Sequence, residues 1–159
     1  MAMRWPILLA LVVAGCGDEA YDLDGGDQIP VGRAYVAERG CPACHQSPNA
    51  ADGILSGQTT ARAGTLVYPA NLTPDSATGL GDWADLEIIR AMRAGVDNQQ
   101  LPLCPPMPRF DGSDAKEPAM TDLEANAIVA YLRSLPAVAR AIPASQCALK
   151  TPPDLAVHD

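Results

Sequence analysis

Two cysteines and a histidine close together constrain this chain more than any other feature of its sequence. Cys41 and Cys44 are separated by two residues, and His45 follows directly, in the order Cys-Pro-Ala-Cys-His. At a helix end this spacing places both thiols on one face and brings the imidazole to the same side. In a shuffled chain with five cysteines and two histidines among 159 residues, the pattern is expected on the order of 0.002 times. The three side chains are therefore predicted to act together.

This spacing is the attachment signal for a haem of the c type, in which two thiols add to the vinyl groups and the histidine binds the iron. Two other interpretations compete with it. A thioredoxin-like redox pair would follow a strand in a βαβ unit, and the sequence shows no strand pattern. A structural zinc site needs four ligands, but no second Cys-x-x-Cys or His-x-x-x-His pair occurs. We therefore predict one covalent haem at Cys41 and Cys44, with His45 as an axial ligand of the iron.

The second axial ligand of the iron must come from elsewhere in the chain. The other histidine, His158, lies one residue from the C-terminus, where chains fray. Among the methionines we favour Met107, because prolines on both sides hold its segment extended and let it present a thioether to a flat face. Met120 is the alternative, and Met92 is expected to pack in the core.

The N-terminal residues 1–16 are predicted to be an export signal. One arginine precedes an apolar stretch that is too short to cross a bilayer as a mature helix. The stretch ends at Cys16 after small residues, which resembles the lipidation site of bacterial lipoproteins. The alternatives are an ordinary signal peptide cleaved nearby and a start that is not exported, with a cysteine there by chance. Residues 17–28, with five acids and no base, are predicted to be a flexible tether. We therefore expect an exported protein, lipid-anchored on the periplasmic side of a bacterial membrane.

The two remaining cysteines are predicted to pair with each other. Cys104 and Cys147 are left once the lipid and the haem have taken three, and an even remainder in an oxidising compartment favours a disulfide. Two buried free thiols are the alternative. The bond would tie the Met107 segment to residues 137–159, which are rich in proline and are predicted to be an extended tail.

Composition limits the function further. The formal net charge is −8 and the isoelectric point is about 4.6. Nucleic-acid binding needs a basic face, so we expect no nucleic-acid partner. Aromatic residues make up only 4% of the chain, which leaves a small core that a cofactor with its own apolar surface would help to complete.

The folded domain is predicted at residues 29–136 and is expected to be all-α, since no segment alternates like a strand. A first helix is expected over about residues 31–39. A second is expected to open with Asp82 as its N-cap and to stop at Gly95. The long stretch between His45 and this helix has little periodicity, and we expect it to wrap a large ligand.

The clearest helix signal lies near the end of this domain. Thr121 and Glu124 have the spacing of a capping box, and Pro136 ends the helix. Its predicted apolar stripe consists of Leu123, Ala127, Ile128, Tyr131 and Leu132.

With a Cys-x-x-Cys-His motif after a first helix, a later loop methionine and a final helix, the chain resembles the class I cytochrome c family. The resemblance covers roughly residues 29–136. In that fold the helix that leads into the motif crosses the C-terminal helix, and a loop supplies the methionine. The positions that match the crossing are Gly32, Tyr35, Val36, Ile128, Tyr131 and Leu132.

Three segments are similar, more narrowly, to the cytochrome subunits that accept electrons from periplasmic alcohol, aldehyde and sugar-acid dehydrogenases. They are Asn-Leu-Thr-Pro-Asp at residues 71–75, Thr-Gly-Leu-Gly-Asp-Trp at residues 78–83 and Pro-Met-Pro at residues 106–108. Those subunits often carry several haem motifs, whereas this chain carries one. The resemblance implies that the first of these segments lines the haem edge.

The expected function is one-electron transfer and not catalysis, because histidine and methionine together leave no open position for oxygen or peroxide. Expected partners are redox proteins: a dehydrogenase, of which this chain would be the electron-accepting subunit, or a terminal oxidase or other respiratory complex. The membrane would be a further partner through the lipid on Cys16. The alternative from another class is a five-coordinate haem peroxidase or gas sensor, in which neither Met107 nor Met120 binds the iron.

Overall fold

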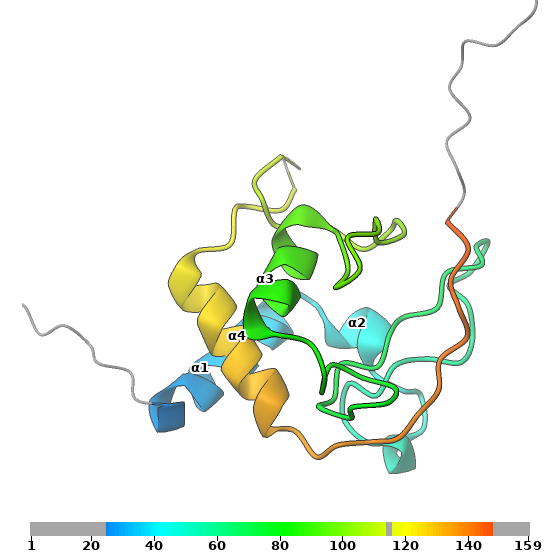
Figure 1. The fold of residues 1–159 in the computed structure, drawn as a ribbon, viewed down its shortest axis with the longest axis horizontal. Coiled ribbons are helices and arrows are strands. Elements are labelled where there is room, and N and C mark those ends of the chain that lie inside the picture. The colour runs from blue at the N-terminus through cyan, green and yellow to red at the C-terminus, as the bar shows by residue number, and fades with distance from the viewer. Residues whose placement is uncertain (1–24, 114–115, 148–159) are drawn as a thin grey trace, which may run out of the picture.

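The computed structural model of the protein describes residues 25–113 and 116–147. Its helices are α1 (Gly25–Glu38), α2 (Pro42–His45), α3 (Asp85–Ala94) and α4 (Asp122–Ser134), with a short 3-10 turn at Ala50–Asp52 (Figure 1). Across the described ranges, extended pairing is limited to two isolated bridges. The predicted all-α class is therefore confirmed.

Some sequence predictions concern residues that the structure does not describe. These are the export signal with its lipidation site at Cys16, most of the acidic tether, and His158 near the C-terminus. Within the two described ranges, no helix is both long enough and apolar enough to cross a bilayer.

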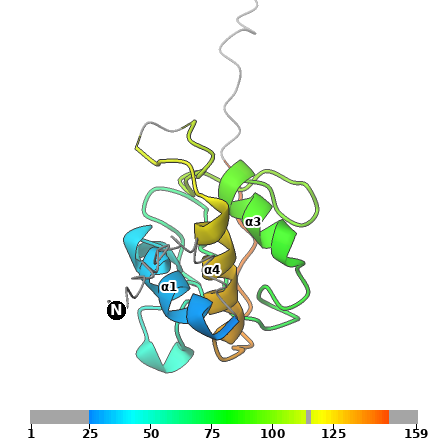
Figure 2. The ribbon, with the colours of Figure 1, turned by 90° about the vertical axis from the view of Figure 1, so that its left-hand side faces the viewer.

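Helices α1 and α4 cross closely, and Figure 2 shows them side by side from a second direction. Gly32 lies at the crossing, where an added Cβ would stand 1.8 Å from the carbonyl oxygen of Ala127. The missing side chain therefore lets the two backbones approach. Val36 of α1 and Ile128 and Leu132 of α4 are buried around this contact. This is the crossing that the resemblance implied.

The first helix is longer than predicted. α1 begins at Gly25 and continues through Pro30, so the prediction of a flexible tether is wrong for residues 25–28. Proline suggested a boundary here because inside a helix it removes one backbone hydrogen bond, but its fixed φ is compatible with helical backbone and α1 continues through it. The helix can therefore extend upstream of it.

Helix α3 begins later than predicted, so Asp82 is not its N-cap. The N-cap is Ala84, whose N–H donates to the carboxylate of Glu87 at 2.8 Å. Residues before it form a turn, because Arg133 of α4 donates to the carbonyl of Leu80 at 2.6 Å and also to that of Trp83. The predicted stop is confirmed, since Gly95 takes a left-handed conformation with φ of 66°.

Helix α4 has the predicted N-cap but only half of the capping box. The hydroxyl of Thr121 accepts from the N–H of Glu124 at 3.2 Å. The Glu124 carboxylate turns away from the N-cap and pairs with Arg39, at the end of α1. Leu123 was placed in the apolar stripe, which is wrong: it is 53% exposed.

The core lies between α1, α3, α4 and the loops that join them. Its buried apolar side chains are Val36, Leu55, Leu80, Ile88, Met92, Phe110, Met120, Ala125, Ile128, Val129, Leu132 and Leu135. Met92 packs there as predicted. Phe110 is the one phenylalanine of the sequence, so aliphatic side chains fill most of this core.

Candidate functional site

The cysteine motif occupies the short helix α2, directly after the turn that ends α1. Gly40, with φ of 69°, lets the chain reverse there. The N–H groups of Cys44 and His45 both donate to the carbonyl of Cys41, at 3.2 and 2.9 Å. This helical turn puts the three side chains of the motif on neighbouring positions. Both thiols are free and half-buried.

An ion pair fixes the end of α1 just before this turn. The guanidinium of Arg39 donates twice to the Glu124 carboxylate of α4, and once to the carbonyl of Pro118 at 2.9 Å. The two side chains are 10% and 7% exposed, and the guanidinium also lies 4.9 Å from the centre of the Phe110 ring. The motif therefore starts from a point that is tied to the first turn of α4.

His45 is held with one ring nitrogen committed and the other free for a metal. Its Nδ1 lies 2.8 Å from the carbonyl oxygen of Ala70. A carbonyl only accepts hydrogen bonds, so Nδ1 carries the proton and the lone pair is on Nε2. Burial lowers the pKa of His45, and the bond to Ala70 opposes this shift in part. The imidazole is therefore neutral at neutral pH, the form that binds iron.

Two loop segments frame His45 and hold the Ala70 carbonyl in place. The backbone of Gln58 donates to Pro69 at 3.0 Å, and that of Leu72 donates to Leu55 at 2.9 Å. Gly57, next to them, donates to the carbonyl of His45 itself at 2.8 Å. An added Cβ at Gly57 would meet the backbone of residues 69–71 at 2.8 Å, so only glycine fits between the segments.

The two polar side chains of the Asn-Leu-Thr-Pro segment are buried and hydrogen-bonded within the protein. The side-chain oxygen of Asn71 accepts from the N–H and the hydroxyl of Thr73, at 3.0 and 2.8 Å. Its amide nitrogen donates to the carbonyl of Val138, beyond α4, at 2.8 Å. Both side chains are at most 2% exposed. The segment therefore fixes the loop that carries the Ala70 carbonyl.

Met107 lies on a loop that is anchored to α3 at both ends. Leu103 donates to the carbonyl of Gly95 at 2.8 Å, and Phe110 donates to that of Met92 at 3.1 Å. Met107 is half-buried and packs at the rim of the core, as Cys41 does. The alternative ligand, Met120, is 5% exposed and packs inside the core.

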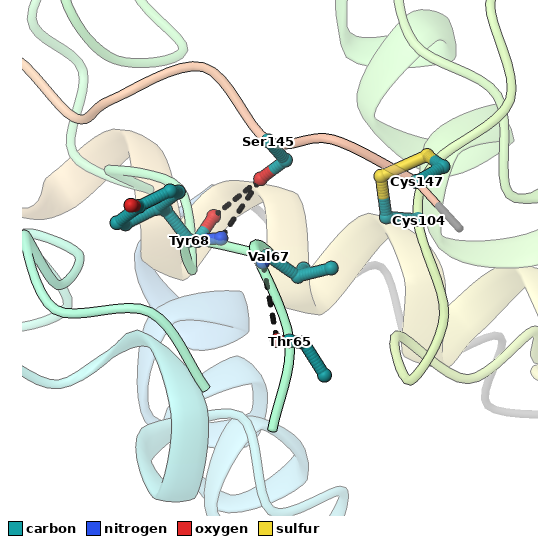
Figure 3. The surroundings of a disulfide bond; sticks show 6 residues. All are labelled: Thr65, Val67, Tyr68, Cys104, Ser145 and Cys147. Atoms are coloured by element: carbon teal, nitrogen blue, oxygen red, sulfur yellow. Dashed lines mark hydrogen bonds between the residues drawn. A yellow bond between two sulfur atoms is a disulfide. The ribbon is translucent and has the colours of Figure 1, made fainter. Parts of the chain in front are cut away.

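The structure also joins the two cysteines that were expected to pair. The sulfurs of Cys104 and Cys147 form a disulfide, with the Cα atoms 4.9 Å apart (Figure 3). Cys104 accepts through its carbonyl from the N–H of Met107 at 3.2 Å. The bond thus ties the Met107 loop to the chain after α4.

A match to a known protein family identifies the arrangement of Cys41, Cys44 and His45. Residues 31–136 match the family model described as cytochrome c. The chain belongs to the cytochrome c family. The prediction from the sequence motifs is confirmed, and this cytochrome is an electron carrier of the kind that binds haem c covalently.

Three relatives of this cytochrome are known bacterial redox proteins. It is 34% identical to one subunit of the nicotinate dehydrogenase of Pseudomonas putida, over 72% of this chain and 9% of that protein. It is 34% identical to the gluconate 2-dehydrogenase cytochrome c subunit of Pantoea cypripedii over 64% of this chain and 23% of that protein. It is 31% identical to a dihaem cytochrome c-type protein of Cereibacter sphaeroides, over 64% and 34% of the two chains. The match thus spans about a third or less of each relative's length.

The donor set of this cytochrome fits a haem better than it fits the other sites considered. Burial raises the pKa of the Cys41 thiol to about 11, whereas redox cysteines and zinc ligands act as thiolates. Among the residues that the structure describes, no group of three or more His, Cys, Asp and Glu side chains could hold a metal ion. Two thiols and an oriented imidazole are the groups that covalent haem attachment uses.

Sequence reasoning missed the residues that support the motif. Ala70 acts through its backbone carbonyl, and nothing in the residue type signals that role. Arg62, whose guanidinium lies 3.1 Å from the sulfur of Cys44, was also missed, because one arginine in a loop has no distinctive pattern. Gly57 was recognisable only as one of several loop glycines.

Proposed function

We propose that this cytochrome carries one haem, bound covalently by Cys41 and Cys44, with His45 and Met107 as the axial ligands. It transfers single electrons on the periplasmic side of a bacterial membrane, to which a lipid on Cys16 anchors it. The observation that carries the proposal is the orientation of His45, whose Nδ1 is bound to Ala70 and whose Nε2 is left for iron. The single Cys-x-x-Cys-His motif in the sequence supports a haem count of one.

The placement of the two candidate methionines supports Met107. Its side chain lies at the rim of the core, on a loop that two backbone hydrogen bonds fix to α3. Met120 is 5% exposed inside the core, one residue before the α4 N-cap. If Met120 moved out of the core to bind the iron, it would leave a cavity behind and disturb the start of α4.

A bound haem supplies one-electron chemistry at its iron. The residues of this chain would set the conditions for that chemistry. His45 and Met107 would hold the iron, and the soft thioether of Met107 would favour the ferrous state. Apolar side chains at the core rim, such as Leu72 and Trp83, would keep water from a haem bound against this rim and would so disfavour the extra charge of the ferric state. Electron exchange then needs little rearrangement of the protein.

The redox partner is proposed from the relatives. Two of them are named as parts of dehydrogenases, so we propose a periplasmic dehydrogenase as the electron donor and a respiratory complex or terminal oxidase as the acceptor. A complex between electron-transfer proteins is expected to be small and short-lived.

The ligand assignment is tested by matched variants of the two methionines. Met107→Leu should remove the weak iron–thioether charge-transfer band of the ferric protein. It should also lower the reduction potential by on the order of 0.1 V, within the roughly 0.8 V range that axial ligands control. Met120→Leu conserves volume in the core and should keep both the band and the potential.

The outcomes of this test separate the competing functions. Loss of the band in Met120→Leu, with its retention in Met107→Leu, would overturn the assignment. A wild-type ferric protein that is high-spin and lacks the band would favour the five-coordinate peroxidase or gas sensor instead.

A further inference from the structure

Residues 137–147, which we call the strap, leave α4 and run across the molecule as an extended chain (Figure 1). They lie beyond the part that matches the cytochrome c family, which ends at residue 136. None of the strap's side chains is buried, so filling the core does not explain its course. Its contacts with three other segments do.

The first half of the strap is bound to the loop after His45. Val138 accepts from the Asn71 amide at 2.8 Å and donates to the Thr73 hydroxyl at 3.1 Å. Arg140 donates through its backbone to the hydroxyl of Thr78 at 2.9 Å. The guanidinium of Arg140 also forms an ion pair with Asp52. This half therefore holds the Asn-Leu-Thr-Pro segment through the two buried polar side chains, Asn71 and Thr73.

The second half continues along the same loop toward Ala70. The hydroxyl of Ser145 accepts from the N–H of Tyr68 at 2.8 Å and donates to the Tyr68 carbonyl at 3.2 Å. Figure 3 shows both hydrogen bonds. Gln146 donates to the carbonyl of Leu66 at 2.9 Å. Ala70, whose carbonyl orients His45, lies two residues beyond Tyr68. The strap is therefore bonded on both sides of that carbonyl.

The last residue of the strap is bonded to the loop that carries Met107. Cys147 is bonded to Cys104, whose carbonyl accepts from the N–H of Met107. One extended segment of eleven residues, 137–147, thus contacts the loop behind His45 and ends covalently on the loop of Met107. The two loops are otherwise far apart in sequence.

We infer that the strap is a clamp that positions Met107 for the iron by joining its loop to the loop that orients His45. The inference rests on the proposed ligation by Met107. A thioether is a weak ligand of ferric haem, so it stays bound only where its loop cannot swing away. By tying the loop to the side of the molecule that holds His45, the strap keeps the open form of the site rare.

The clamp predicts how readily an added ligand replaces Met107. In the ferric holoprotein, Cys104→Ser combined with Cys147→Ser should tighten imidazole binding by about tenfold, because the apparent affinity rises with the population of the open form. The thioether band should also disappear at a lower pH than in the wild type. Ser145→Ala keeps the disulfide and should tighten imidazole binding by roughly twofold to threefold.

A control variant distinguishes loss of the clamp from a general loss of protein stability. Ile128→Val removes one methyl from the core at the crossing of α1 and α4, where Ile128 is 1% exposed, and should lower the unfolding temperature without changing imidazole affinity. The inference is overturned if Ile128→Val tightens imidazole binding as much as the double variant does. It is also overturned if the double variant binds imidazole like the wild type. If the double variant does not mature, unchanged affinity in Ser145→Ala overturns the inference and increased affinity supports it.

The same measurements distinguish this inference from the proposed function. A wild-type protein without the thioether band contradicts ligation by Met107, and the clamp then falls with it. A wild-type protein that has the band, with variants that retain the imidazole affinity of the wild type, contradicts the clamp alone.

Discussion

At the scale of single residues, the site depends on groups that hold the motif in place as much as on the motif. Ala70 orients His45 through a carbonyl, and Gly57 lets the two framing segments approach. Arg39 and Glu124 form a nearly buried ion pair that ties the end of α1 to α4. Removing one partner of such a pair leaves the other charge buried and unpaired.

The ion pair gives a stability prediction with an internal control. Glu124→Gln should lower the free energy of unfolding by about 3 kcal/mol, because the Arg39 guanidinium loses its buried counter-ion. Asp122→Asn removes a neighbouring acid in the same turn of α4, whose side chain is 88% exposed and pairs with Arg93. It should change stability by less than about 1 kcal/mol. Denaturant unfolding of the holoprotein measures both, and equal effects would contradict the special role of the buried pair.

At the scale of elements, the crossing of α1 and α4 decides where the motif sits. α2 follows α1 after one turn, so the angle and separation of that crossing position Cys41, Cys44 and His45. Gly32 sets the separation, because any side chain there would meet the backbone of α4. The loop that follows His45 and the loop that carries Met107 both pack against the same core.

The crossing gives a prediction for Gly32→Ala. The new methyl group would overlap the Ala127 carbonyl, so the helices must separate and the protein should lose at least about 2 kcal/mol of stability. Gly64→Ala is the control: its added Cβ meets nothing within 4 Å, although its φ is 74°, and it should cost only about 1 kcal/mol from backbone strain. A thermal melt in which Gly32→Ala is as stable as the control would show that the helices adjust freely.

At the scale of the whole molecule, the protein is a small electron carrier whose proposed lipid would keep it near membrane partners. Each buried CH₂ of an acyl chain contributes about 0.8 kcal/mol of membrane affinity, so several chains on one cysteine suffice for stable anchoring. An anchored carrier searches for partners in two dimensions. This role needs no membrane-spanning helix in the folded part.

The anchor is tested by Cys16→Ser. The variant should move from the membrane fraction to the soluble periplasmic fraction while the folded domain keeps its haem spectrum, since the haem motif lies elsewhere in the chain. Wild-type protein found in the soluble fraction, or carrying no lipid by mass spectrometry, would contradict lipidation.

The sequence predicted those features that depend on which residues are present at short spacing. The Cys-x-x-Cys-His motif indicates haem because the attachment needs two thiols and an imidazole within one helical turn. The Thr121 cap and the Gly95 stop are local for the same reason. Asp82 was wrongly predicted as an N-cap because Arg133 binds the carbonyls on either side of it and holds this stretch in a turn. Leu123 was wrongly placed in the apolar stripe because the elements that pack against α4 decide which of its faces is buried.

Only the tertiary structure decided which backbone groups support the site. The Ala70 carbonyl and the strap act through main-chain atoms, which every residue type carries, so no sequence pattern marks them. The disulfide partners could be paired by counting the cysteines that the lipid and the haem leave over. That count does not reveal that the strap is bound to the His45 loop before it reaches Cys104. The sequence by itself determined the chemistry at Cys41, Cys44 and His45, and the packing of the chain determined how firmly that chemistry is held.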